Sequence, residues 1–171
     1  MTKKRKKEGG GAAPDGGYRP STTPRRYVSP PLRLGVDADT ARADIEVHGL
    51  DHAGASFEGR VFLNNVDADE TTPRTPAAGY AGTFHVFGHG GCVGDDESHC
   101  CVRVRRPYDP RPEHPLTPMR KVVMATEALR RAAAKGKTAR ITIVPVISSA
   151  TQRCEIEHVL RFETLHVVTY G

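Results

Sequence analysis

Apolar and polar side chains alternate along much of this chain, and that alternation predicts β-strands. Between Ala43 and His48 the odd positions are apolar and the even positions are polar, which is typical of a strand with one buried face. In the segment Thr83–Phe87, Phe84 and Val86 share one face, and the flanking polar residues and Phe87 share the other. Similar patterns predict further strands over Arg60–Asn65, Cys101–Arg105, Arg140–Ser148 and Cys154–Tyr170.

A single short helix is expected after Thr126, which is placed as its N-cap, with Gly136 just past its end.

Pro145 lies inside the strand Arg140–Ser148 and therefore indicates an edge strand or a bulge. In the last predicted strand, the apolar side chains occupy even-numbered positions up to Phe162 and odd-numbered positions from Leu165. A bulge near residues 163–164 would keep both sets facing the core. Residues 65–78 and 107–118 are rich in turn formers and proline, and we expect loops there.

Six or seven short strands with one helix predict an all-β fold, an antiparallel β-sandwich or jelly-roll-like domain. We assign residues 34–171 to this single domain, because 171 residues suffice for one core. Residues 1–33 are basic, rich in Gly and Pro, and almost without large apolar side chains. Such a segment buries too little surface to offset its ordering entropy, so a disordered tail is expected.

The basic residues of the chain are concentrated near its N-terminus, so the net charge says little about the partners of the predicted domain. The formal net charge is +5, but residues 1–33 carry nine basic and only two acidic side chains. The predicted domain is therefore not basic, which argues against specific nucleic-acid binding. No apolar run is long enough to span a membrane, and no apolar stretch follows the basic N-terminus as in a secretory signal. We expect a cytoplasmic protein with reduced cysteines.

The segment from residue 80 to residue 101 combines histidines, cysteines and glycines, and is the best candidate for a metal site. Imidazole and thiolate are ligands for zinc and copper, and glycine allows a tight loop around an ion. No standard zinc-finger spacing occurs, so two alternatives stay open: a disulfide between Cys92 and Cys100, or structural side chains with no ligand role. Copper is the first candidate and zinc the alternative, with ligands drawn from His85, His89, Cys92, His99, Cys100 and Cys101.

Four segments in order resemble one known family: RVFLNN (60–65), YAGTFHVFGHG (80–90), TPMRKVVMATEALRRAAAKGK (117–137) and ITIVPVI (141–147). Together they resemble the C-terminal β-domain of tyrosinases and polyphenol oxidases, over roughly residues 40–170. The resemblance implies a β-sandwich that packs beside a dicopper catalytic domain. There it shields the copper entrance, assists maturation or holds a latent enzyme closed.

The catalytic half of that family is missing from this sequence. A dicopper pair requires six histidines on a helical bundle, whereas the one predicted helix holds no histidine. No Ser/His/Asp order, phosphate loop or paired catalytic carboxylate stands out either, so no catalytic residue is assigned. The leading hypothesis is a non-catalytic accessory or shielding module whose partner is a tyrosinase-type dicopper enzyme chain. The alternatives are an independent metal-binding or redox-sensing β-protein and a small enzyme with a mononuclear metal centre.

Overall fold

The computed structural model describes residues 24–37, 39–52, 54–88, 117–147 and 159–171, and it confirms an all-β fold. In these ranges every paired strand runs antiparallel to its neighbour, and one α-helix is present. The elements are β1 (Tyr27–Val28), β2 (Leu32–Arg33), β3 (Arg42–Leu50), β4 (Phe57–Leu63), the 3₁₀ turn η1 (Pro76–Ala78), β5 (Tyr80–Val86), β6 (Met119–Met124), α1 (Thr126–Ala133), β7 (Thr138–Ala139), β8 (Ile141–Val146) and β9 (Thr164–Tyr170).

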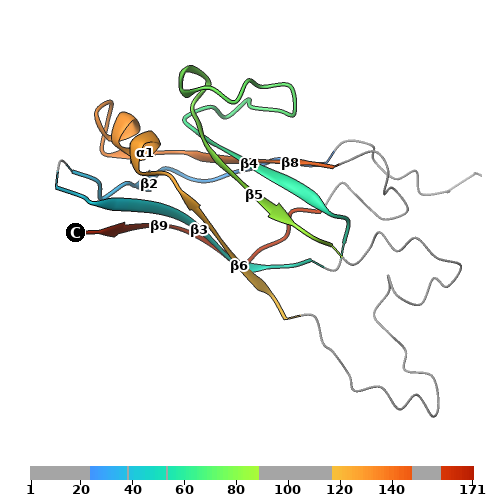
Figure 1. The fold of residues 1–171 in the computed structure, drawn as a ribbon. Coiled ribbons are helices and arrows are strands. Elements are labelled where there is room, and N and C mark those ends of the chain that lie inside the picture. The colour runs from blue at the N-terminus through green and yellow to red at the C-terminus, as the bar shows by residue number, and fades with distance from the viewer. Residues whose placement is uncertain (1–23, 38, 53, 89–116, 148–158) are drawn as a thin grey trace, which may run out of the picture.

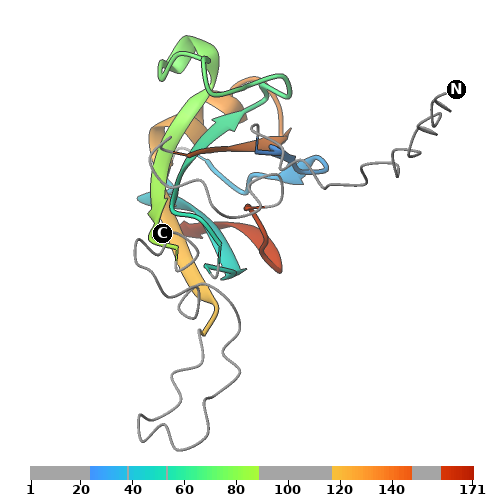
Figure 2. The same ribbon diagram turned by 90° about the vertical axis from the view of Figure 1, so that its right-hand side faces the viewer.

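Two main sheets enclose the core. The first has the strand order β1-β8-β4-β5, and we call it sheet A; the second has the order β6-β3-β9, and we call it sheet C. Strands β2 and β7 form a separate pair. Figures 1 and 2 show β4 and β8 of sheet A above β3 and β9 of sheet C, with α1 at one end. The core therefore lies between the inner faces of the two sheets, as in a β-sandwich.

The predicted alternation explains which side chains form that core. On β3, Ala43, Ile45 and Val47 are fully buried and face sheet A, with Val123 of β6 and Val167 of β9 opposite Ile45. Strand β4 contributes Phe57, Val61 and Leu63, and strand β8 contributes Ile141 and Ile143. Burial of these aliphatic and aromatic side chains is the main force that holds the two sheets together.

The helix differs from the prediction at its first turn. Thr126 was expected as the N-cap, but the helix begins at Thr126 and its N-cap is Ala125, which makes no side-chain capping bond. The Thr126 Oγ1 instead accepts a hydrogen bond from the backbone N of Ala43, at 3.0 Å. The hydroxyl thus ties the helix to β3, and buried Leu129 packs the helix onto the core.

Pro145 occupies the position that its missing N–H allows. Strand β8 lies between β1 and β4, but β1 pairs only with Ile143 and Thr142. Pro145 lies beyond β1, opposite Gly59 of β4, so among the described strands β8 has a free edge at this proline. The predicted edge or bulge at Pro145 is therefore met only locally, because β8 as a whole lies between β1 and β4 and is not an edge strand.

Other predicted boundaries change. Residues 24–33 fell within the predicted disordered tail, yet Tyr27–Val28 pairs with β8 and Leu32–Arg33 pairs with β7. These pairings place the start of the ordered chain before residue 34. In the predicted last strand, residues 159–163 are not part of a strand, the chain bends at Glu163 and β9 begins at Thr164, whereas residues 154–158 fall outside the described residues. The predicted strand over residues 101–105 and the disorder of residues 1–23 fall outside the described residues.

Candidate functional site

The exposed end of β5 is the described part of the predicted functional segment. Phe84 and Val86 are buried, whereas His85 is exposed and Phe87 is 78 % exposed. The predicted division of this strand into two faces is therefore confirmed. Because Phe87 directly follows β5 on the outward side of sheet A, the chain presents a large aromatic ring to solvent there.

The backbone beneath this ring is fixed. The N–H of Gly88 donates a hydrogen bond to the Oγ of Ser56, at 2.9 Å, which ties the end of β5 to the segment before β4. A Cβ at residue 88 would overlap the carbonyl oxygen of Gly54 and the backbone of Ala55, so only glycine fits this close approach. The backbone next to Phe87 is thus restrained by a hydrogen bond and a close approach.

A charged network lies on the same outward face of sheet A. Glu58 accepts hydrogen bonds from Arg60, at 3.1 Å, and from Arg74, at 3.0 Å. His85 is the cross-strand partner of Glu58, but no hydrogen bond or ion pair in the described ranges engages its ring. Both ring nitrogens of His85 therefore stay free to contact a ligand or partner.

Of the six predicted metal ligands, only His85 belongs to the described residues. His89, Cys92, His99, Cys100 and Cys101 lie outside them, so the metal site stays a prediction. The part of the chain that is described contains no group of three or more His, Cys, Asp or Glu side chains able to hold a metal ion.

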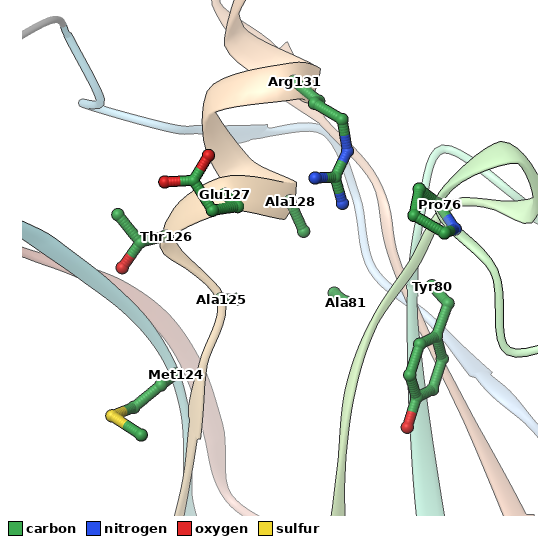
Figure 3. A pocket seen from close by; sticks show the side chains of 9 residues that line it. All are labelled: Pro76, Tyr80, Ala81, Met124, Ala125, Thr126, Glu127, Ala128 and Arg131. Carbon is green, nitrogen blue, oxygen red and sulfur yellow. The ribbon is translucent and has the colours of Figure 1, made fainter.

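A second candidate is a cleft of about 350 Å³ between η1, the start of β5 and the junction of β6 with α1. Next to the cleft, β5 and β6 approach each other closely at Gly82, where an added Cβ would overlap the side chain of Val123. Figure 3 shows Arg131 reaching from α1 towards Pro76 and Tyr80 on the opposite wall.

The polar groups that line the cleft are mostly engaged elsewhere. The Tyr80 hydroxyl lies 2.7 Å from the Thr83 hydroxyl, and Glu127 is paired with Arg130 at 2.7 Å. Among the described residues that line the cleft, the one carboxylate is that of Glu127, which Arg130 holds through Oε1, and no imidazole is present, so the cleft offers a surface for contact rather than an acid–base pair.

Sequence reasoning missed a third group, on the outward side of sheet C. Glu46 is almost completely buried and accepts hydrogen bonds from Arg120 of β6, with an Nε to Oε2 distance of 3.1 Å. The Nε2 of His48 lies 2.7 Å from the same Oε2, and the His48 ring meets the His166 ring edge-on at 5.5 Å. The alternation of β3 marked Glu46 and His48 as outward-facing, but it gave no sign of Arg120, which is 74 residues away.

This contact network perturbs the titration of Glu46. Hydrogen bonds from Arg120, then from His48, lower the pKa of Glu46 below its ordinary value, in spite of its burial. The same ion pair raises the pKa of Arg120. Because the folded-state pKa of Glu46 is lower than the unfolded-state pKa, its contribution to stability is fully present above the unfolded-state pKa. That contribution is lost as the pH falls through the folded-state pKa.

We expect Glu46→Gln to lower the free energy of unfolding at neutral pH by about 1–2 kcal/mol, because Arg120 and His48 lose a charged acceptor. Below the ordinary carboxyl pKa the difference between the variant and the wild type should shrink. Urea unfolding at pH 7 and at about pH 3.5 measures both effects. An equal difference at the two pH values would show that the carboxylate charge of Glu46 is not what stabilises this face.

Comparison with solved structures supplies the class of protein that the fold resembles. A recombinantly expressed latent aurone synthase, described as a polyphenol oxidase, superposes with a TM-score of 0.50 at 16 % identity. The same enzyme from its natural source gives a TM-score of 0.50 at 17 % identity. The matches cover 95 % and 92 % of this chain, but only 28 % and 27 % of the respective polyphenol oxidase chains.

These identities show a shared fold and nothing finer. This chain spans little more than a quarter of the enzymes that it resembles, in agreement with a likeness to one domain of a polyphenol oxidase. No protein-family model matches the sequence, and no curated protein matches it either. Among the described residues, no helix has the length and apolar character that a membrane crossing requires.

Proposed function

We propose that this chain is a non-catalytic accessory or shielding module, which docks on a tyrosinase-type dicopper enzyme chain through the exposed end of β5. The observation that carries the proposal is Phe87, 78 % exposed and held on a fixed backbone. The fold likeness to a fraction of a polyphenol oxidase chain supports the choice of partner.

The physical basis of docking is the burial of the Phe87 ring. Complete burial of a Phe side chain contributes about 1.5–3 kcal/mol, and aromatic anchors commonly dominate the binding energy of an interface. The hydrogen bond from Gly88 to Ser56 already restrains the backbone next to the ring, so less backbone entropy is lost on binding. His85, two residues earlier on the same face, adds a donor or acceptor next to the ring.

The test is a binding titration of this chain against a purified tyrosinase-type dicopper chain. We expect Phe87→Asp to weaken binding at least about tenfold, because a charge replaces the buried ring. Val66→Asp is the matched control, since Val66 is also an exposed apolar residue but lies in the loop after β4. Diphenol oxidation by the partner, measured in parallel, should fall as the wild-type chain binds.

Two outcomes would contradict the proposal. In the first, the mixture runs as two independent species in native mass spectrometry at all concentrations. In the second, Phe87→Asp and Val66→Asp weaken binding equally, which would mean that the end of β5 is not the contact.

We also propose that the end of β5 and the segment after it bind one copper ion, with zinc as the alternative, through His85 and neighbouring His and Cys side chains. The support from the described residues is limited to His85, which is exposed and free of polar partners among them. Intact mass measured under native and then denaturing conditions tests this directly. A native mass excess of one metal ion that persists in His85→Ala would remove His85 from the ligand set.

A further inference from the structure

The outward face of sheet C has an unusual arrangement of charge. Asp44 and Glu46 point away from the core on the central strand β3, yet their side chains are 0 % and 5 % exposed. Each carboxylate is covered by one guanidinium that binds it side-on, through Nε and Nη2. The Arg42 pair has N–O distances of 2.9 and 2.6 Å, and Arg120 binds Glu46 in the same way.

These two ion pairs hold the arginine side chains in place and leave part of each guanidinium available. No described group accepts a hydrogen bond from Nη1 of Arg42 or of Arg120. The Arg42 guanidinium also lies over the ring of Tyr170, at 5.4 Å from its centre. Both arginines are therefore ordered before any partner binds, which lowers the entropy cost of using them in an interface.

Exposed apolar side chains flank the ion pairs. Met124, Val122 and Tyr170 are 71 %, 38 % and 41 % exposed. Their cross-strand partners are Asp44, Glu46 and Arg42, so they share the outward face of sheet C. Of the large hydrophobic side chains that are exposed in the described residues, most gather on this one face.

The composition of this face matches the core of a protein interface. Interface cores are enriched in Tyr, Met and Arg and depleted in exposed Lys, Glu and Asp, and Tyr and Arg are frequent hot spots. Here the acidic side chains are buried beneath the arginines, and no lysine belongs to the outward positions of β3, β6 or β9.

The balance of charge indicates what covers the face. Two guanidinium groups meet two carboxylates, so the face has no excess charge to attract a polyanion or an anionic membrane surface. It offers free donors at Nη1 of the arginines and the ring nitrogens of His166, which no described polar group engages; a neutral imidazole supplies one donor and one acceptor. Donors, acceptors and apolar groups together on one neutral patch are what an isologous interface requires, because each patch must complement itself.

We propose that two copies of this chain associate through the outward faces of sheet C and form a twofold-symmetric dimer. The apolar strip of Val122 and Met124 packs against its symmetry mate, and the Nη1 groups donate across the interface. This surface faces away from the outward side of sheet A, where Phe87 lies, so the dimer does not depend on the accessory function proposed above.

Sedimentation equilibrium of the full chain tests the dimer, at neutral pH, with a reductant that excludes disulfide-linked species. Over about 1 µM to 1 mM we expect the mean mass to rise from the monomer value of 18.6 kDa towards twice that value. Met124→Asp should raise the dimer dissociation constant at least about tenfold, because it places a carboxylate in the apolar strip of both copies. Met124 is exposed, so the variant keeps the fold, and circular dichroism and a thermal midpoint verify this.

The controls separate this proposal from the docking of Phe87. Phe87→Asp and Val66→Asp should leave the dimer unchanged, and Met124→Asp should leave the binding of a tyrosinase-type chain unchanged. A wild-type chain that stays monomeric at every concentration overturns the dimer. So does a dimer that Met124→Asp leaves unaltered, since its contact would then lie elsewhere.

Discussion

Replacement of Ile45 by alanine should lower the free energy of unfolding by about 2–5 kcal/mol, the range for a large aliphatic side chain removed from a packed core. Ile45 is completely buried at the middle of β3, the central strand of sheet C. Val123 and Val167 flank it from the neighbouring strands. Because strands on both sides hold the backbone, the cavity cannot collapse easily, and the cost should lie in the upper half of the range.

Urea unfolding followed by far-ultraviolet circular dichroism and tyrosine fluorescence measures this effect, since the chain has no tryptophan. Val66→Ala provides the control at an exposed apolar position, where a change within about 0.5 kcal/mol is expected. A loss below about 1 kcal/mol for Ile45→Ala would mean that sheet C is not packed against sheet A as described.

Strands β3 and β5 could be predicted because their apolar side chains alternate with polar ones and one set lies between the two sheets. Strands β4 and β8 could be predicted as short apolar runs instead, because both are buried on two faces: Phe62 and Val144 form a second cluster with Ala68 on the outward side of sheet A.

Strand β6 was missed because its inward positions are Met119, Lys121 and Val123, so a lysine interrupts the apolar set, while Val122 and Met124 are apolar on the exposed side. Because Val122 and Met124 are apolar and exposed on the outward face of sheet C, the sequence of β6 shows no clear alternation and does not predict a strand.

The two-residue strands were beyond sequence reasoning for a different reason. Tyr27–Val28 and Leu32–Arg33 are too short to show any period, and their conformation depends on partners more than 100 residues away. Ser29 illustrates this dependence, since its buried Oγ accepts a hydrogen bond from the backbone N of Ile141 at 2.9 Å. No local pattern around residue 29 reports such a contact.

For the candidate site, the sequence predicted the two faces of β5 but not the geometry that makes one of them useful. The alternation along β5 predicts that Phe87 faces outward. The hydrogen bond that restrains the backbone next to it joins Gly88 to Ser56, which is 32 residues earlier in the sequence. The buried pair of Glu46 and Arg120 likewise depends on the register between β3 and β6, which a one-dimensional pattern does not specify. Local chemistry could therefore be predicted, and its tertiary partners could not.

Gly88→Ala should both destabilise the chain and weaken docking of the exposed end of β5. A Cβ at residue 88 meets backbone atoms of Gly54 and Ala55, which cannot turn aside as a flexible side chain can. The chain must move apart there, and the hydrogen bond from Gly88 to Ser56 breaks with it. We expect the free energy of unfolding to fall by about 1–3 kcal/mol, the usual cost of overpacking.

The same displacement removes the restraint on the backbone next to Phe87, so binding to a tyrosinase-type chain should weaken at least about tenfold although the ring itself is retained. Gly136→Ala is the matched control, because a Cβ there meets only the carbonyl oxygen of Thr138, at 4.0 Å. Ser56→Ala removes the hydrogen bond without the overlap and should give an intermediate loss of affinity. If Gly88→Ala binds as tightly as the wild type while Phe87→Asp does not, the ring would act without that backbone restraint. The close approach at Gly88 would then serve stability alone.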